Sequence, residues 1–248
     1  MSTQAGSEIT YEVFTKQHFD QVLSLLLGPF LRDEPLNVAV GLTAAEAAQF
    51  YRLFADDALN DKASYVAIDQ NTGKVVGCRL GKLEPQGENH TEATFIPSQY
   101  SSKVQTITRL LDFLEDPSSS NNASQEVALT ANQENSKNIN SNLKNLNLKN
   151  EKVFKFLIVT TDTAYRRRGI AKKLVELSMS RARELLGATC VTTTATSAKT
   201  QRMFEDIFKF ETVKIVNLHS YVDAVTGKRP FEGVPDDNLV AKFMVKKL

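Results

Sequence analysis

Three consecutive arginines followed by Gly-Ile-Ala form the segment whose residue types and spacing point most clearly to chemistry. The segment runs from Arg166 to Ala171, between a run of apolar residues and a long amphipathic stretch. The first amides of a helix have no intrahelical acceptor, and the helix dipole adds partial positive charge there. Gly169 leaves the backbone accessible, and the arginines add full charges nearby. This junction predicts a site for an anion such as a diphosphate.

The hexapeptide alone is equally compatible with a basic helix start without a ligand, or with a nuclear-targeting-like cluster. Its flanking elements favour the anion site. The apolar, β-branched run at 153–161 is typical of a central strand. A long amphipathic helix is expected at 168–186, with Gly187 as its stop, and a strand at 189–196 and a helix at 197–207 follow.

The rest of the chain predicts further strands and helices around the same sheet. Gly28 and Pro29 are expected to end the first helix, and 30–37 to be a loop or a short helical turn. Thr43 and Glu46 have the spacing of a capping box at the start of the second helix. The pattern indicates the α/β class, with a single mixed, mostly antiparallel sheet flanked by helices. The remaining expected strands are 9–14, 64–69, 74–83, 211–217 and 239–247, and the remaining helices are 17–27, 44–59 and 104–114.

Length and composition favour one globular domain. The chain has 248 residues, of which 42% are hydrophobic and 24% charged, so it can bury a core. We expect a single domain over 1–248. The Asn- and Ser-rich stretch at 115–150 lacks the apolar surface that offsets ordering entropy, and we expect a disordered or weakly helical surface insertion there, or an interaction segment.

The charge balance argues against two classes of partner. A net charge of +1 gives no electrostatic case for nucleic acid or for an anionic membrane surface. The N-terminus lacks a signal peptide, and no stretch reaches the length of a membrane span. We therefore expect a soluble, cytoplasmic protein, a monomer that binds neither nucleic acid nor membrane.

Cysteines and histidines supply no catalytic or metal-binding pattern. Cys78 and Cys190 lack metal-ligand or redox spacing, and we expect both to be buried as small hydrophobic residues. His18, His90 and His219 stand apart from one another and from any nucleophile, so surface or packing roles are favoured. No metal site is expected.

The arginine segment resembles the phosphate-binding signature of the GNAT superfamily of N-acetyltransferases. That signature is Gln/Arg-x-x-Gly-x-Gly/Ala after the fourth strand, and Arg166 to Ala171 fits it at each specified position. The resemblance extends from about Val153 to Val216 and implies the acetyltransferase fold with acetyl-CoA as cosubstrate. By this resemblance, the end of the strand pairs with the pantetheine arm and the helix amides hold the pyrophosphate. The implied cosubstrate residues are Val159, Thr160, Thr161, Arg166, Arg167, Arg168, Gly169, Ile170 and Ala171.

A shorter segment resembles the insect-type arylalkylamine (dopamine/serotonin) N-acetyltransferases. Phe30 to Asn37 contains Asp-Glu-Pro-Leu-Asn, in which the family's Glu is the general base. Carried over, that role falls on Glu34, which would take a proton from the incoming ammonium group. Shielding by neighbouring apolar residues would raise its pKa toward the working range. Without the resemblance, Glu34 reads as a surface acid like Asp33.

The leaving thiolate has no obvious acid in this sequence. Many members of the superfamily place a Tyr near the position of Phe204, which cannot donate a proton. Insect-type enzymes have hydroxyl residues one turn apart in this region, and Thr196 and Thr200 match that spacing. Ser197 is an alternative hydroxyl and is assigned to the cosubstrate site, although a helix N-cap explains Thr196 or Ser197 equally well. A family Gly is also missing in Phe208-Lys209-Phe210, which affects the helix stop.

The resemblance implies direct transfer of an acetyl group to a small arylalkylamine in a ternary complex. Phe30, Phe50, Tyr51 and Phe54 lean toward an aromatic acceptor, although core packing explains them at least as well. His219 and Tyr221 belong to a long loop that is a further candidate for the acceptor pocket. A polyamine, an amino acid or a protein amine remains an alternative acceptor, and a CoA-binding sensor without turnover is the alternative of another class.

Overall fold

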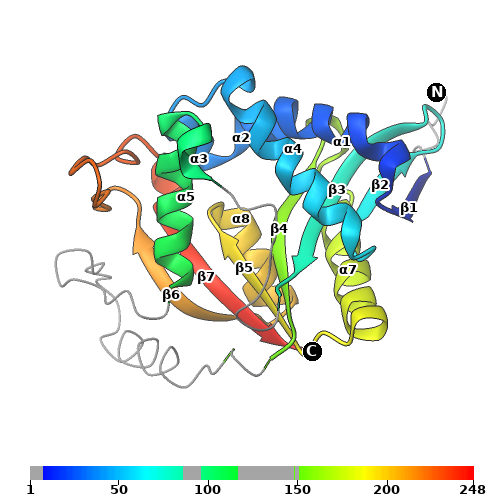
Figure 1. Ribbon diagram of the computed structural model, residues 1–248. Coiled ribbons are helices and arrows are strands. Elements are labelled where there is room, and N and C mark those ends of the chain that lie inside the picture. Colours follow the sequence, from blue (N-terminus) through cyan, green and yellow to red (C-terminus); the bar gives the residue numbers. More distant parts are fainter. Residues whose placement is uncertain (1–7, 86–95, 117–147, 149–150) are drawn as a thin grey trace.

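Seven strands form one open, mixed sheet at the centre of the protein (Figure 1). The computed structural model describes residues 8–85, 96–116, 148 and 151–248. Neighbouring strands are antiparallel except β4 and β5, which are parallel. The strand order is β1-β2-β3-β4-β5-β7-β6, which confirms the fold class that the sequence predicts. The strands are β1 (Ile9–Val13), β2 (Tyr65–Asp69), β3 (Lys74–Leu83), β4 (Val153–Thr161), β5 (Cys190–Ala195), β6 (Glu211–Asn217) and β7 (Val240–Lys247).

The parallel pair β4–β5 separates after a short stretch of pairing. Val153 to Phe156 pair with Cys190 to Thr193, and the pairing ends there. Within the described residues, the β5-facing edge of β4 therefore has no strand partner beyond Phe156, and the two strands diverge (Figure 1). A register shift in the β3–β4 ladder, between Leu80 and Gly81, lies at the same level. On this edge, the backbone groups of β4 from Leu157 onward therefore have no described strand to bind.

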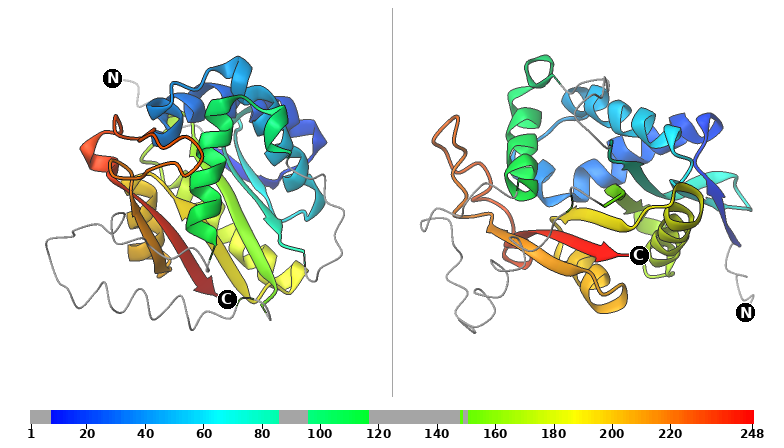
Figure 2. Two further views of the ribbon diagram at one scale, coloured as in Figure 1. Left: turned by 60° about the vertical axis from the view of Figure 1, so that its left-hand side comes forward. Right: turned by 60° about the horizontal axis from the view of Figure 1, so that its bottom comes forward.

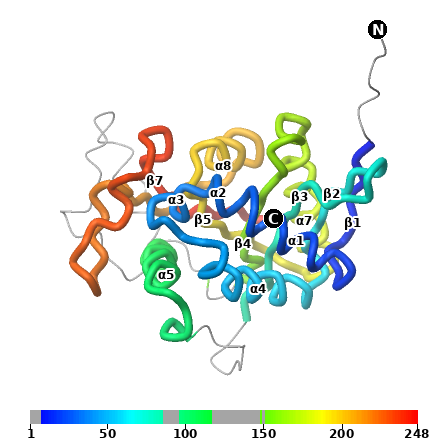
Figure 3. Tube along the Cα trace, turned by 90° about the horizontal axis from the view of Figure 1, so that it is seen from above, coloured from blue at the N-terminus to red at the C-terminus, as the bar shows by residue number. Residues whose placement is uncertain are grey.

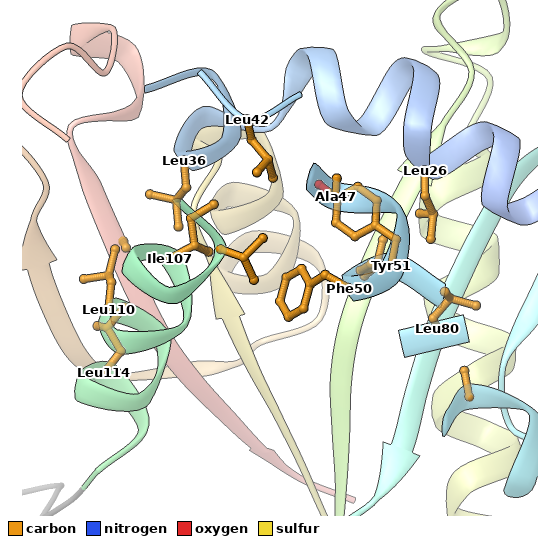
Figure 4. Packing of buried hydrophobic residues seen from close by; sticks show 14 of the residues in the cluster. Leu26, Leu36, Leu42, Ala47, Phe50, Tyr51, Leu80, Ile107, Leu110 and Leu114 are labelled. Atoms are coloured by element: carbon orange, nitrogen blue, oxygen red, sulfur yellow. The ribbon is translucent and has the colours of Figure 1, made fainter. Parts of the chain in front are cut away.

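Helices from the first half of the chain cover one face of the sheet (Figure 2). Buried apolar side chains from these helices meet β3 and β4 in the largest core cluster. Figure 4 shows side chains of this cluster from α3, α4, α5 and β3 pointing into one core. The capping box at Thr43 and Glu46 is present as predicted. These helices are α1 (Phe19–Leu25), α2 (Leu31–Asp33), α3 (Pro35–Ala39), α4 (Ala44–Asn60) and α5 (Ser102–Glu115).

The expectation that Gly28 and Pro29 end the first helix is wrong. The helical path continues from α1 through a π-helical turn, Leu26–Phe30, into α2. A π turn widens the helix, so the ring of Pro29 and its missing N–H are accommodated without a break. The chain leaves the helical conformation only at Glu34, where ψ is 122°, and α3 begins at the next residue. The segment expected to be a loop or a short turn is thus two short helices meeting at Glu34.

Two helices from the second half of the chain cover the opposite face. They are α7 (Ile170–Leu186) and α8 (Ala198–Arg202), the latter continued by a π turn at Met203–Ile207. α7 starts two residues later than predicted and is bounded by Gly169 and Gly187, both left-handed. After the π turn, Lys209 has φ 57° in the segment where the family Gly is missing. Lys209 therefore adopts the backbone conformation that glycine reaches without strain.

Close packing of β3 on β4 depends on Gly81. A Cβ atom at this position would lie 2.7 Å from the Lys155 carbonyl oxygen and 2.9 Å from the Phe154 ring. We expect Gly81→Ala to lower the free energy of unfolding by about 1–3 kcal/mol, because both neighbours belong to the packed sheet. Gly28→Ala is the control, since no atom lies within 4 Å of its added Cβ. Urea denaturation would measure both; equal stability of the two variants would contradict this packing.

Several smaller predictions can be compared with the structure. Cys78 and Cys190 are buried as expected, and burial raises their thiol pKa values to about 12 and about 11. His18 is buried and hydrogen-bonded to Thr15, in agreement with a packing role. His90 and nearly all of the Asn- and Ser-rich stretch 115–150 lie outside the described residues. None of the described helices combines the length and apolarity needed to span a bilayer.

Candidate active site

A single cavity of about 970 Å³ connects the helix start at the arginine segment with the segment around Glu34. It opens where β4 and β5 diverge, and Leu157 to Thr161 of β4 form one of its walls. α8 forms another wall, and the α2–α3 segment lies beside it when the molecule is seen from above (Figure 3). The volume is in the range of small-molecule sites. The split in the sheet therefore produces the cavity that joins the two predicted sites.

Glu34 occupies the break between α2 and α3. Its amide donates to the carbonyl of Phe30 at 2.9 Å, which closes the preceding helix. Its Oε2 accepts from the amide of Asn37 at 2.8 Å, so the side chain caps α3. Pro35 suits the first position of α3, because its missing N–H would have no partner there. These local interactions fix the Glu34 carboxylate at the cavity wall.

The second oxygen of Glu34 accepts a hydrogen bond from Thr196. The Thr196 Oγ1 to Glu34 Oε1 distance is 2.7 Å, across 162 positions of the chain. Burial raises the pKa of Glu34, although hydrogen bonds from Thr196 and from the amides of Asn37 and Leu36 act in the opposite direction. A carboxylate with a raised pKa takes up a proton more readily near neutral pH. The site therefore places a carboxylate with a raised pKa at the cavity wall.

Asn37 and Tyr51 form a second polar contact beside Glu34. The Asn37 side-chain amide donates to the Tyr51 hydroxyl at 2.6 Å, and both residues are buried. Burial and the negative charge of Glu34 raise the pKa of Tyr51. The hydroxyl thus stays protonated, with its own proton available as a donor. Sequence reasoning missed this pair, since an Asn in a helix and a Tyr fourteen residues later give no local signal.

Loss of the Thr196 hydroxyl is expected to change the pH dependence of activity. A hydrogen bond to the charged carboxylate lowers its pKa, so Thr196→Val should raise the pKa of Glu34 further. Because a general base works only when deprotonated, a role of Glu34 as the base predicts that the rising limb of kcat/KM against pH moves to higher pH in Thr196→Val. Thr196→Ser keeps the hydroxyl and should keep the limb in place. A pH–rate profile measures this shift. Coincident limbs for the wild type and both variants would show that Thr196 does not affect the pKa of Glu34.

The arginine segment forms a strained turn before α7. Arg167 and Gly169 both have positive φ, 61° and 76°, and the amides before Lys173 precede the first bond of the helix. Turns of this kind direct successive N–H groups toward one point, where an anion binds. A left-handed Arg167 is uncommon for a residue with a side chain, and such strain clusters at functional sites. The backbone before α7 thus has the geometry that an anion site would need, and the site itself stays a prediction.

Asp33 links the arginine segment to the α2–α3 segment. Its carboxylate accepts hydrogen bonds from Arg166 and, at 2.9 Å, from Arg32. Arg32 also donates to the Thr163 hydroxyl at 2.8 Å. Partial burial raises the pKa of Asp33, yet the bonds from Arg32 and Arg166 hold it below its ordinary value. Asp33 therefore stays ionised and ties the two ends of the cavity together, a role that its sequence position did not reveal.

Comparison with solved structures places this arrangement in a known fold. Arylalkylamine N-acetyltransferase 2 from Aedes aegypti matches with a TM-score of 0.74 and 25% identity, over 97% of this chain and 99% of that one. The chain has the GNAT acetyltransferase fold. Two further GNAT neighbours, a mosquito arylalkylamine N-acetyltransferase-like protein 5b and the Drosophila melanogaster polyamine N-acetyltransferase, match with TM-scores of 0.72 and 0.70, at 18% and 16% identity. Each of these two matches covers 97% of this chain and 100% of the neighbour's chain. By sequence, the chain matches no family model and no curated protein.

The GNAT fold brings nearly all of the predicted site residues into one cavity. Glu34 and the hydroxyl residues Thr196, Ser197 and Thr200 line it, and Glu34 bonds to Thr196 among them. Arg168 is the exception among the predicted residues, because it does not line the cavity and its guanidinium lies 5.3 Å from the centre of the Tyr165 ring. The predicted cosubstrate residues in the wall are Val159, Thr160, Thr161, Arg166, Arg167, Gly169, Ile170 and Ala171.

The long loop before β7 contributes different residues from those expected. His219 Nε2 donates to the Val234 carbonyl at 2.6 Å, and Tyr221 packs against Phe113 and Phe231. Neither lines the cavity. Asp237 and Asn238 of the same loop do, and the Asn238 side chain accepts from the Ala198 amide at 3.0 Å. The loop therefore supports the start of α8 and reaches the cavity at its end.

Proposed function

We propose that this protein transfers an acetyl group from acetyl-CoA to the primary amine of a small arylalkylamine, by direct attack in a ternary complex. The observation that carries the proposal is the single cavity that connects the anion site before α7 with the Glu34 carboxylate. Acetyl-transfer chemistry needs an activated acyl group and a deprotonated amine in contact. The GNAT fold of the neighbouring structures supports the same reaction class. The whole chain, 1–248, would act as one such domain, without a metal.

The described residues fit acetyl-CoA. The amides at the start of α7, with Arg166 and Arg167 in the cavity wall, suit a diphosphate. The unpaired edge of β4 offers backbone groups to the amides of a pantetheine arm. Thr161 lines the cavity, and its Oγ1 is buried without a hydrogen-bond partner among the described residues. A polar ligand along β4 would satisfy this hydroxyl.

The other end of the cavity suits an aromatic amine. Aromatic side chains contact one another there, with ring centres 5.6 Å apart for Phe30 and Tyr51 and 4.4 Å apart for Phe50 and Phe54. Ile107 and Leu111 of α5 complete this apolar wall. Glu34 is the acid that faces it from the break between α2 and α3. An aryl ring would be bound by the apolar wall while its amine approaches Glu34.

The proposed reaction uses few groups of the protein. Glu34 accepts a proton from the ammonium group of the acceptor, and the freed nitrogen then attacks the thioester carbon. A backbone amide near Thr161 donates to the developing oxyanion. The carbon–sulfur bond breaks and its electron pair leaves on sulfur, while the nitrogen gives up its second proton to the departing thiolate, so that the products are the neutral amide and the CoA thiol. A CoA thiolate is a fairly good leaving group, which is consistent with Phe204 in place of a Tyr acid.

A panel assay of acetyl-CoA consumption tests the proposal. The panel contains arylalkylamines such as tyramine, dopamine and serotonin, polyamines such as spermidine and agmatine, and N-terminal peptides. We expect turnover with the arylalkylamines to exceed turnover with the others. A preference for polyamines would show that the acceptor is a polyamine and not an arylalkylamine. CoA binding without turnover of any amine would favour a CoA-binding sensor.

A further inference from the structure

Arg79 is a buried arginine in the wall of the cavity that the proposed chemistry does not use. It lies on β3 directly opposite Val159 of β4, the middle of the stretch where β4 has lost its other neighbour. Only 1% of its surface is exposed, yet it is among the residues that line the cavity. Arginine is rarely buried to this degree without a partner of opposite charge.

The hydrogen bonds of Arg79 leave part of its guanidinium unsatisfied. Nη1 donates to the carbonyls of Leu80 and Ile158, the latter at 2.7 Å. Nε and Nη2 are buried and have no hydrogen-bond partner in the part of the chain that the structure describes. The guanidinium carbon lies 3.2 Å from the centre of the Phe156 ring, so the face of the group is covered by an aromatic side chain. Two donors therefore remain within the plane of the group.

No carboxylate among the described residues offsets the charge of Arg79. Burial lowers its pKa, and among the described residues the one other contributor is Cys78, a thiol. A buried cation without an anion and with two idle donors costs stability. Native proteins keep such groups satisfied, by protein, water or ligand. An acceptor from outside the protein would supply what the structure around Arg79 lacks.

The position of Arg79 indicates which ligand part reaches it. A molecule that extends from the arginine segment along β4 to Glu34 must pass Leu157 to Thr161, and Val159 is level with Arg79. Phe204, another cavity residue, packs on Phe156 with ring centres 6.1 Å apart. Arg79 therefore lies between the diphosphate end and the reacting end, beside the path of the connecting arm.

We propose that Arg79 positions the cosubstrate by donating hydrogen bonds from Nε and Nη2 to a carbonyl oxygen of its pantetheine arm. The inference rests on the proposed function, because it takes acetyl-CoA as the molecule that follows β4. Arg79 is a positioning residue, since it holds the arm and, through the Ile158 carbonyl, the shape of β4. It has no part in the proton transfer at Glu34.

Calorimetric titration with two ligands tests this role. The ligands are CoA and adenosine 3′-phosphate 5′-diphosphate, which is CoA without its arm. Arg79→Lys and Arg79→Met should bind CoA about 10- to 100-fold more weakly than the wild type, while the nucleotide binds equally to all. Arg183→Met removes an exposed arginine of α7 and should leave both affinities unchanged. KM for acetyl-CoA should rise more than kcat falls.

Two results would overturn the inference. Equal loss for CoA and the nucleotide indicates a structural role, and no loss for either indicates that water satisfies Arg79. If the variants do not fold, the Nε–H resonance of Arg79 in the wild type should shift with CoA and stay in place with the nucleotide; the same spectrum with both ligands would also overturn it. Failure of the wild type to bind either ligand would instead refute the proposed function.

Discussion

Glu34→Gln is expected to lower kcat roughly 100- to 1,000-fold, because the amine then keeps its proton in the ternary complex. Gln preserves the shape of the side chain and can still accept a hydrogen bond from Thr196 or from the Asn37 amide. Affinity for CoA should stay close to that of the wild type, since Glu34 lies at the other end of the cavity. Steady-state rates with the best amine of the panel, together with CoA titration, measure both quantities.

The pH profile identifies Glu34 as the base more specifically than the loss of rate. Because burial raises its pKa, the rising limb of kcat/KM in the wild type should lie above the range of an ordinary glutamate. The rate rises with pH there because the carboxylate must be deprotonated. The limb should disappear in Glu34→Gln and persist in Asp56→Asn, a matched change at an exposed carboxylate of α4. A limb retained in Glu34→Gln would assign the base to another group.

The double variant Arg166→Gln, Arg167→Gln is expected to weaken CoA binding roughly 100-fold, since charge-assisted bonds to a diphosphate are lost. Both residues line the cavity beside the first amides of α7. Arg168→Gln removes one charge, half of what the double variant removes, from a side chain outside the cavity wall, and should weaken binding much less than the roughly tenfold expected for each of the other two positions. Titration at two salt concentrations measures the difference. If each of the three arginines contributed equally to CoA affinity, the segment would attract CoA by its overall charge and not through a defined site.

The arginine segment shows which features of this protein can be predicted from neighbouring residues alone. The start of α7 and the strand before it follow from neighbouring residues, and the structure has both elements in place. Gly169 and Gly187 are recognisable because left-handed positions favour glycine. The start of α4 was equally predictable, since Thr43 and Glu46 satisfy each other over a single turn. In each case the determining interactions lie within a few residues.

The rest of the site depends on contacts between distant segments. Thr196 bonds to Glu34 across 162 positions, and Arg166 bonds to Asp33 across 133. The π turn at Pro29 was also not predicted, because a Gly-Pro pair usually marks the end of a helix. The local sequence does not show that the helical path continues past Pro29. Arg79 reads as an ordinary strand residue in the sequence. Its burial becomes visible only in the folded protein, where its guanidinium lies against the Phe156 ring of β4.

Equilibrium titration of the purified protein with CoA tests the central claim most directly, because both the acceptor site and Glu34 have a purpose only if the cosubstrate binds. We predict saturable binding of one CoA per chain, with a dissociation constant of about 1–100 μM, in the range of ordinary enzyme substrates. The heat of binding should decrease when Arg166 and Arg167 are replaced. No detectable binding of CoA at millimolar concentration would contradict the account.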